Sequence, residues 1–119
     1  MSWKPDKNRP ICPQIYEHIC VEIASFRYES GDKLPSVREL AVEIGVNPNT
    51  VQRSYELLEQ NGIIYTERNL GRFVSDNTDI AKEAVREIAE IKTDEYLRSM
   101  FALGMNVVAV EKIIKEWNK

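Results

Sequence analysis

Residues 47–53, with the sequence NPNTVQR, place five polar side chains close together. Asn49 and Gln52 each carry an amide donor and an amide acceptor, the combination that can bond adenine bidentately. Thr50 can bond a phosphate or contact a thymine methyl group, and Arg53 can pair with a phosphate. The stretch therefore has the chemistry to contact nucleic-acid bases, although the same amides and hydroxyl could serve only as polar caps of a helix.

The surroundings of this stretch lack negative charge. No acidic residue lies between Glu43 and Glu56, and the basic residue Arg38 stands shortly before that span. A surface that binds nucleic acid needs a locally positive, donor-rich face, so the local composition favours such binding. An alternative role for two of the arginines is a surface ion pair within the protein. Arg38 could pair with Glu39, and Arg53 could pair with Glu56.

The overall composition is that of an ordinary globular protein: 119 residues, 43% hydrophobic and 29% charged, with a net charge of −3. This length allows one domain, or one small domain with an appendage. The negative net charge weakens a nucleic-acid interpretation without excluding it, because the local charge decides. No apolar run approaches the ~18–20 residues of a membrane span, and no signal peptide is evident. We therefore expect a cytoplasmic protein that contacts no membrane.

The sequence offers no set of residues for catalysis or for metal binding. Cys12 and Cys20 are too few for a disulfide framework and are expected to be reduced thiols, with Cys20 half-buried on a helix. The single histidine, His18, is expected to be solvated or half-buried, and its spacing from the cysteines fits no zinc motif. No nucleotide-binding loop is present. We expect a protein that is not an enzyme and needs no metal or cofactor.

The polar stretch lies at the start of the second of two short predicted helices. Ser36 and Glu39 form a capping box that begins the first helix. Gly45 can adopt the left-handed conformation that ends it. Asn47 is a favoured N-cap, and Pro48 fits the first position of the second helix. Two short helices around a glycine-containing turn predict a helix-turn-helix over about residues 36–55.

The flanking sequence supplies a preceding helix and a following hairpin. Residues 12–31 predict an amphipathic helix that ends before Gly31, with its apolar face formed by Ile15, Ile19, Ile23 and Phe26. Residues 32–35 read as an extended link, and residues 63–74 as two β-runs around a turn. The predicted fold is mainly α with a small β-hairpin wing: a winged helix-turn-helix domain over residues 9–77, with its wing at about 63–75.

Residues 78–119 predict a separate helical segment. One long helix runs from about 78 to 103, Gly104 ends it, and Asn106 caps a last helix over 107–117. Two amphipathic helices cannot bury their apolar faces alone, so they must pack on the winged domain or on a second copy. We expect a dimerisation segment, with the contacts made by Ile80, Ala84, Ile88, Ile91, Leu97, Met100, Phe101, Ile114 and Trp117.

Residues 9–76 resemble the winged helix domain of the GntR family of bacterial transcription regulators. The matching motifs are L-P-S-x-R-x-L-A, G-V-N-x-x-T-V, L-x-x-x-G-I-I and a wing that ends in G-x-F-V. The short two-helix tail is similar to that of the YtrA subfamily, whose members are often repressors of transporter operons. The resemblance implies a homodimer that binds a palindromic operator in double-stranded DNA. The resemblance leaves open whether a small-molecule effector binds to the protein.

The wing departs from the family pattern R-G-x-G-T-F-V, which here reads RNLGRFV at residues 68–74. Asn69 replaces a glycine, and asparagine tolerates positive φ better than most residues. Arg72 replaces a threonine and adds a cation near the wing tip, so Arg68 and Arg72 could reach a minor groove or a phosphate. The candidate DNA-binding residues are Ser36, Arg38, Asn47, Asn49, Thr50, Gln52, Arg53, Arg68, Asn69, Gly71 and Arg72.

An alternative from another class is a winged helix that binds a protein instead of DNA. The acidic net charge would matter more in that case. The arginines around one acid-free stretch favour DNA, and a steep salt dependence of duplex binding would separate the two functions.

Overall fold

The computed structural model describes residues 3–117. The chain divides after Val85 into two compact units, which are described separately below. Residues 118–119, at the end of the predicted helical segment, lie outside the described residues. Within the described part, no helix is both long and apolar enough to span a membrane.

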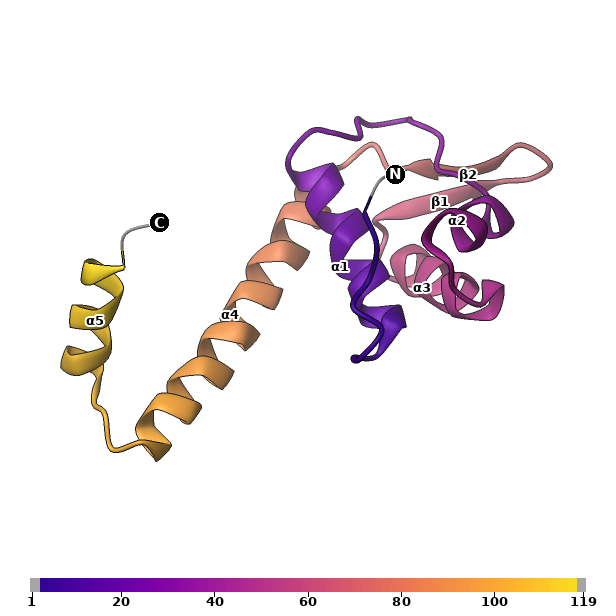
Figure 1. Ribbon diagram of the computed structural model, residues 1–119. Helices are drawn as coiled ribbons and strands as arrows, with labels where there is room; N and C mark the ends of the chain where they lie inside the picture. The colour runs from indigo at the N-terminus through magenta and orange to yellow at the C-terminus, as the bar shows by residue number, and fades with distance from the viewer. Residues whose placement is uncertain (1–2, 118–119) are drawn as a thin grey trace. The chain divides into compact units, whose positions relative to one another are not determined.

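The first unit contains three helices and a two-stranded antiparallel hairpin, in the order predicted from the sequence (Figure 1). These elements and the two helices that follow them confirm the predicted fold class of a winged helix-turn-helix with two C-terminal helices. The elements of this unit are α1 (Ile11–Ala24), α2 (Val37–Ile44), α3 (Pro48–Gln60), β1 (Ile64–Glu67) and β2 (Gly71–Val74).

One hydrophobic core holds the first unit together. The apolar faces of the three helices meet there, and the strands close it from the hairpin side. Burial of a large aliphatic or aromatic side chain stabilises a fold by about 1.5–3 kcal/mol, so this cluster is the main source of stability. The largest fully buried side chains are Tyr55, Ile15, Ile19, Ile23, Leu34, Leu40, Ile44, Leu58, Ile63, Ile64, Val51 and Val74.

The caps of α2 and α3 are those that the sequence predicts. The Ser36 hydroxyl accepts from the Glu39 amide at 3.1 Å, and the Glu39 carboxylate accepts from the Ser36 amide at 2.9 Å. The latter hydrogen bond lowers the pKa of Glu39. Gly45 ends α2 with φ of 70°, and Asn47 caps α3 by accepting from the Asn49 amide at 2.8 Å. The tight turn between the two helices is therefore specified locally.

The hairpin gains a partial third strand from the segment before α2. The Leu34 amide donates to the Arg72 carbonyl at 2.8 Å, and the Gly31 amide donates to the Val74 carbonyl at 2.9 Å. At the wing turn, Asn69 adopts φ of 68°, which confirms the expectation that asparagine would replace glycine there. The link over residues 32–35 is thus extended, as predicted, and it anchors the outer edge of β2.

The end of α1 corrects a prediction. The helix stops at Ala24, and Phe26 lies beyond it, 62% exposed and with φ of 63°. The Phe26 amide donates to the Ile23 carbonyl, and the Arg27 amide donates to the Glu22 carbonyl, which is the Schellman arrangement. The spacing of Phe26 matched the apolar face, but the helix had already ended.

The residues before α1 pack on the first unit, although the predicted domain begins at residue 9. Trp3 stacks on His18 with ring centroids 4.2 Å apart. The Lys7 ammonium donates to the Gly45 carbonyl at 2.8 Å, at the turn between α2 and α3. His18 is half-buried, and burial lowers its pKa. Cys20 is fully buried rather than half-buried, and burial raises its pKa to about 12.

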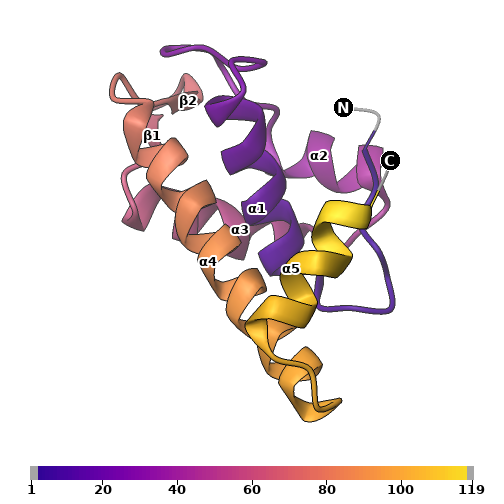
Figure 2. The same cartoon turned by 90° about the vertical axis from the view of Figure 1, so that its left-hand side faces the viewer.

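The two C-terminal helices are α4 (Asp79–Ala102) and α5 (Val107–Glu116), close to the predicted limits. Figure 2 shows the sharp turn that joins them. Gly104 has φ of 88° in that turn, and the Asn106 side chain accepts from the Ala109 amide at 2.9 Å. The start of α4 belongs to the first unit, because Ile80 and Ala84 are half-buried against its core.

Tyr55 supplies a test of how the segment before α2 is fixed. Its hydroxyl donates to the Pro35 carbonyl at 2.7 Å, and burial of the side chain raises its pKa. Tyr55→Phe leaves that carbonyl without its partner, so we expect the free energy of unfolding to fall by about 1–3 kcal/mol. Urea unfolding measures this. Tyr65→Phe, at an exposed residue, is the matched control, and equal losses in both variants would contradict the assignment.

Candidate nucleic-acid interface

The start of α2 and the first turns of α3 expose the polar residues singled out in the sequence. Arg38, Asn49 and Arg53 are exposed, and Thr50 and Gln52 are half-buried. Pro48 begins α3 and Val51 turns into the core, which leaves the remaining side chains of this stretch outside. Because α3 is amphipathic, burial of one face determines which residues the other face presents.

Arg38 does not form the alternative ion pair with Glu39, and Arg53 does not form the alternative ion pair with Glu56. Within residues 3–117, no ion pair involves Arg38 or Arg53. The Glu39 carboxylate instead accepts from the backbone amide of Ser36. The Glu56 carboxylate accepts from the side-chain amide of Gln52 at 3.0 Å. Both guanidinium groups are therefore available to an outside partner.

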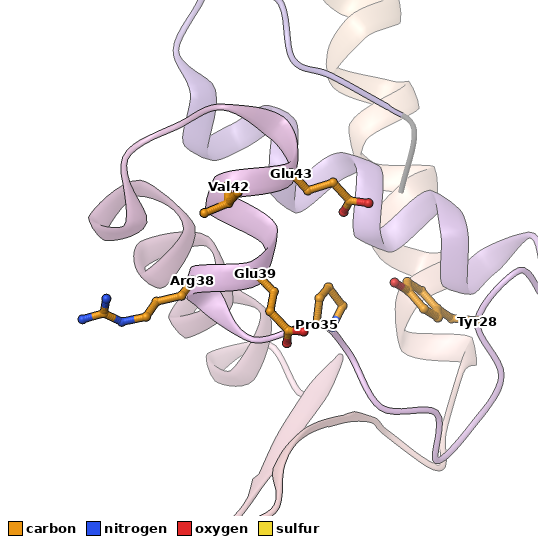
Figure 3. A pocket seen from close by; sticks show the side chains of 6 residues that line it. All are labelled: Tyr28, Pro35, Arg38, Glu39, Val42 and Glu43. Atoms are coloured by element: carbon orange, nitrogen blue, oxygen red, sulfur yellow. The ribbon is translucent and has the colours of Figure 1, made fainter.

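An open groove of about 690 Å³ lies beside α2 (Figure 3). Val42, Pro35 and Tyr28 form its apolar part, and Glu39 and Glu43 bring carboxylates to it. Figure 3 shows the Arg38 side chain directed away from Tyr28 at the other side of the groove. The Arg38 side chain therefore extends away from α2, on the side opposite Tyr28. Arg38 is the remaining residue that lines the groove.

The wing tip is exposed, and the side chain of its cation, Arg68, forms no ion pair within residues 3–117. Arg68, Asn69 and Leu70 are exposed between β1 and β2. Gly71 has φ of 124°, and a Cβ atom there would lie 2.9 Å from Cε of Lys33. A side chain at residue 71 would push the lysine aside, so glycine lets the wing lie close to the segment before α2. The contact of Arg68 with a phosphate stays a prediction, and its exposed position at the wing tip is compatible with it.

Arg72 lies differently from the sequence expectation. Its Nε donates to Glu59 Oε1 at 2.9 Å, and its Nη2 donates to Gln52 Oε1 at 3.4 Å. The guanidinium carbon lies 5.3 Å from the centre of the Tyr55 ring. Arg72 thus contacts α3 instead of extending from the wing tip. The Arg72 side chain is engaged within the protein by the Glu59 carboxylate, and its contact with a groove or phosphate stays a prediction.

Sequence reasoning missed two residues that support this surface. Lys7 bonds the Gly45 carbonyl at the turn, and Glu59 anchors Arg72. Neither has a local signal, because the partners lie 38 and 13 residues away along the chain. Glu59 also accepts from the Thr66 hydroxyl at 2.7 Å, so it joins α3 to both strands of the wing.

The order of the helices and the hairpin defines a winged helix-turn-helix protein. Residues 13–74 match the family described as "Bacterial regulatory proteins, gntR family". The chain belongs to this family, and the match spans α2, α3 and both strands of the wing. The family resemblance seen in the sequence motifs is confirmed.

Similarity to individual family members extends over nearly the whole chain. The chain is 45% identical to the HTH-type transcriptional repressor YtrA of Bacillus subtilis (strain 168) over 97% of its own length and 86% of that protein. It superposes on a GntR family transcriptional regulator from Listeria monocytogenes with a TM-score of 0.84 and 38% identity, covering 96% of this chain and all of that one. The likeness therefore includes the two C-terminal helices.

A DNA complex is also among the similar structures. The DNA-binding domain of AraR in complex with operator ORE1 has a TM-score of 0.54 and 27% identity to this chain. The similarity covers 56% of this chain and 82% of that one.

Proposed function

We propose that this chain is a sequence-specific DNA-binding repressor that acts as a homodimer on a palindromic operator. The observation that carries the proposal is the exposed face of α3, where Asn49 and Arg53 are both exposed and Arg53 forms no ion pair within residues 3–117. The operator-bound AraR domain, which shares this fold, supports DNA as the partner. In such a complex α3 enters the major groove, and its first turns meet the base edges.

The roles follow from the chemistry of each side chain. Asn49 and Gln52 contact bases, and Thr50 contacts a phosphate or a thymine methyl. Arg38 and Arg53 pair with phosphates on either side of the groove. Ser36 and Asn47 cap the N-termini of α2 and α3. Backbone amides and the Ser36 hydroxyl at these N-termini can also donate hydrogen bonds to a phosphate. The wing contributes Arg68, with Asn69 and Gly71 shaping its turn.

The dimer is proposed from the second unit. It exposes several large apolar side chains, among them Ile91 of α4 at 59% and Trp117, directly after α5, at 70%. Apolar patches of this kind normally mark an interface. Ile80 and Ala84 are not part of this surface, because they cover the core of the first unit. The remaining proposed dimer contacts are Ile88, Ile91, Leu97, Met100, Phe101, Ile114 and Trp117.

Two-fold symmetry and the regulated genes complete the proposal. A two-fold dimer presents two copies of α3 to half-sites related by the same symmetry, which is why the operator is palindromic. Similarity to the repressor YtrA supports repression. On the subfamily resemblance alone we extend the proposal to a transporter operon, in the cytoplasm where bacterial DNA lies. Transporter genes adjacent to this gene would support that extension.

Salt dependence tests whether the partner is DNA. A protein that neutralises several phosphates shows a steep linear fall of log K with log salt, with a slope of about −0.9 per contact. We expect this slope for the full chain on duplex DNA, measured by fluorescence anisotropy. Arg38→Ala and Arg53→Ala should each weaken binding to all duplexes and reduce the slope by roughly one unit.

The control for these two variants is Arg27→Ala. Arg27 is also exposed, but it lies after α1 and its Nη1 is 3.6 Å from Glu22 Oε1. It should leave the slope unchanged. A slope that is equally flat in the wild type and in all three variants would indicate a winged helix that binds a protein and not DNA.

A further inference from the structure

The wing and α3 are joined by a series of side-chain hydrogen bonds that we name the Arg72 relay: Gln52, Glu56, Glu59 and Arg72. Arg72 donates through Nε to Glu59 and through Nη2 to Gln52. Gln52 in turn donates through Nε2 to Glu56 at 3.0 Å. The relay therefore runs from β2 of the wing to the DNA-facing part of α3.

Arg72 is held on several sides, so it can fix its partners. Its backbone pairs with Thr66 of β1, and its carbonyl accepts from the Leu34 amide. Its side chain is only 24% exposed and lies over the ring of buried Tyr55. The Thr66 hydroxyl donates to the same Glu59 oxygen that accepts from Arg72, which holds that carboxylate in place.

The relay fixes the orientation of the Gln52 amide. A guanidinium group can only donate hydrogen bonds, and an ionised carboxylate can only accept them. The Gln52 oxygen must therefore face Arg72, and its nitrogen must face Glu56. The flipped amide would put nitrogen against guanidinium and oxygen against carboxylate, and both contacts would be repulsive. One lone pair and one N–H of Gln52 remain for a further partner.

We propose that Arg72 is a positioning residue that sets the base preference of Gln52. This inference rests on the proposed function. Adenine presents its N6 donor and N7 acceptor in a fixed order, so a glutamine with a fixed amide matches one order only. An amide ordered before binding also loses less conformational freedom on binding. Arg72 therefore acts on specificity through Gln52, without contacting a base.

Two variants break the relay while changing the net charge in opposite directions. Arg72→Thr removes a positive charge, and Glu59→Ala removes a negative charge together with the anchor of Arg72. The quantity measured is a ratio of two affinities, one for the best duplex and one for the same duplex with a single base pair changed. That base pair is the one at which Gln52→Ala loses its sequence preference. We expect both variants to lower this ratio roughly ten-fold, the order of one bidentate base contact.

Affinity for unrelated duplex DNA should instead change in opposite directions in the two variants. It should be weaker for Arg72→Thr and stronger for Glu59→Ala, because non-specific affinity follows the charge of the protein. Arg27→Thr is the matched control, since it removes the same charge from an ion pair outside the relay and should leave the ratio unchanged. The double variant Gln52→Ala/Arg72→Thr should show the ratio of Gln52→Ala alone. Thermal unfolding checks each variant, and Glu59→Ala carries the test if Arg72→Thr does not fold.

The inference is overturned if the ratio stays at the wild-type value in the folded variants. It is also overturned if the ratio rises in one variant and falls in the other, because Arg72 would then act only through its charge. A wild-type chain that binds all duplexes equally would instead contradict the proposed function, so the two failures are distinguishable.

Discussion

Phe101→Glu in the 119-residue chain is expected to turn a dimer into a monomer and to weaken binding to a palindromic duplex by roughly 10²–10⁴-fold. Phe101 is 47% exposed near the end of α4, and Ile114 on α5 is 56% exposed. A carboxylate placed in an apolar interface would be buried without a partner, which opposes association. A monomer presents one α3 and half of the phosphate contacts, so it loses the gain from simultaneous binding of two half-sites.

Sedimentation equilibrium and duplex titration measure the two effects on the same sample. Val108→Glu is the matched control, because Val108 is 73% exposed on α5 among the polar residues Glu111 and Lys112. It should remain a dimer with wild-type affinity. A Phe101→Glu protein that stays dimeric, or that binds the palindrome as tightly as the wild type, would require another role for the second unit.

Asn49→Ala and Gln52→Ala are each expected to reduce affinity for the best duplex by about 1–3 kcal/mol, with relaxed preference at one base position. Both amides lie on the first turns of α3, and neither carries a charge. Affinity for unrelated duplexes should therefore barely change, since phosphate contacts dominate non-specific binding.

Gln60→Ala serves as the control for these substitutions. Gln60 is exposed at the opposite end of the same helix, so it shares the chemistry of Gln52 without the location. It should leave both affinity and preference unchanged. If Asn49→Ala, Gln52→Ala and Gln60→Ala all select the same sequence as the wild type, α3 does not contact bases.

The features that could be predicted from the sequence are those fixed by near neighbours. The capping box of Ser36 and Glu39, the cap by Asn47 and the left-handed Gly45 all depend on residues within one or two turns. The positive φ of Asn69 also follows from local chemistry, because asparagine can bond to its own backbone neighbourhood. These elements gave the order of the fold and the location of α3.

The features that could not be predicted depend on distant partners. Arg72 and Gln52 are 20 residues apart, and the periodicity of neither element shows that their side chains meet. Phe26 matched the apolar face of α1 in spacing, yet the helix ended two residues earlier. Ile80 and Ala84 form one stripe with later residues of α4, and the stripe alone does not distinguish a cover for the core from a dimer surface.

Selection from a pool of randomised duplexes tests the central claim most directly. The purified 119-residue chain is incubated with the pool at physiological salt, and the bound duplexes are amplified and sequenced. We predict an enriched palindrome whose half-sites are about one helical turn, roughly 34–36 Å, apart, or a multiple of it. A pool that remains random after repeated rounds, with no duplex bound in preference to another, would contradict the account.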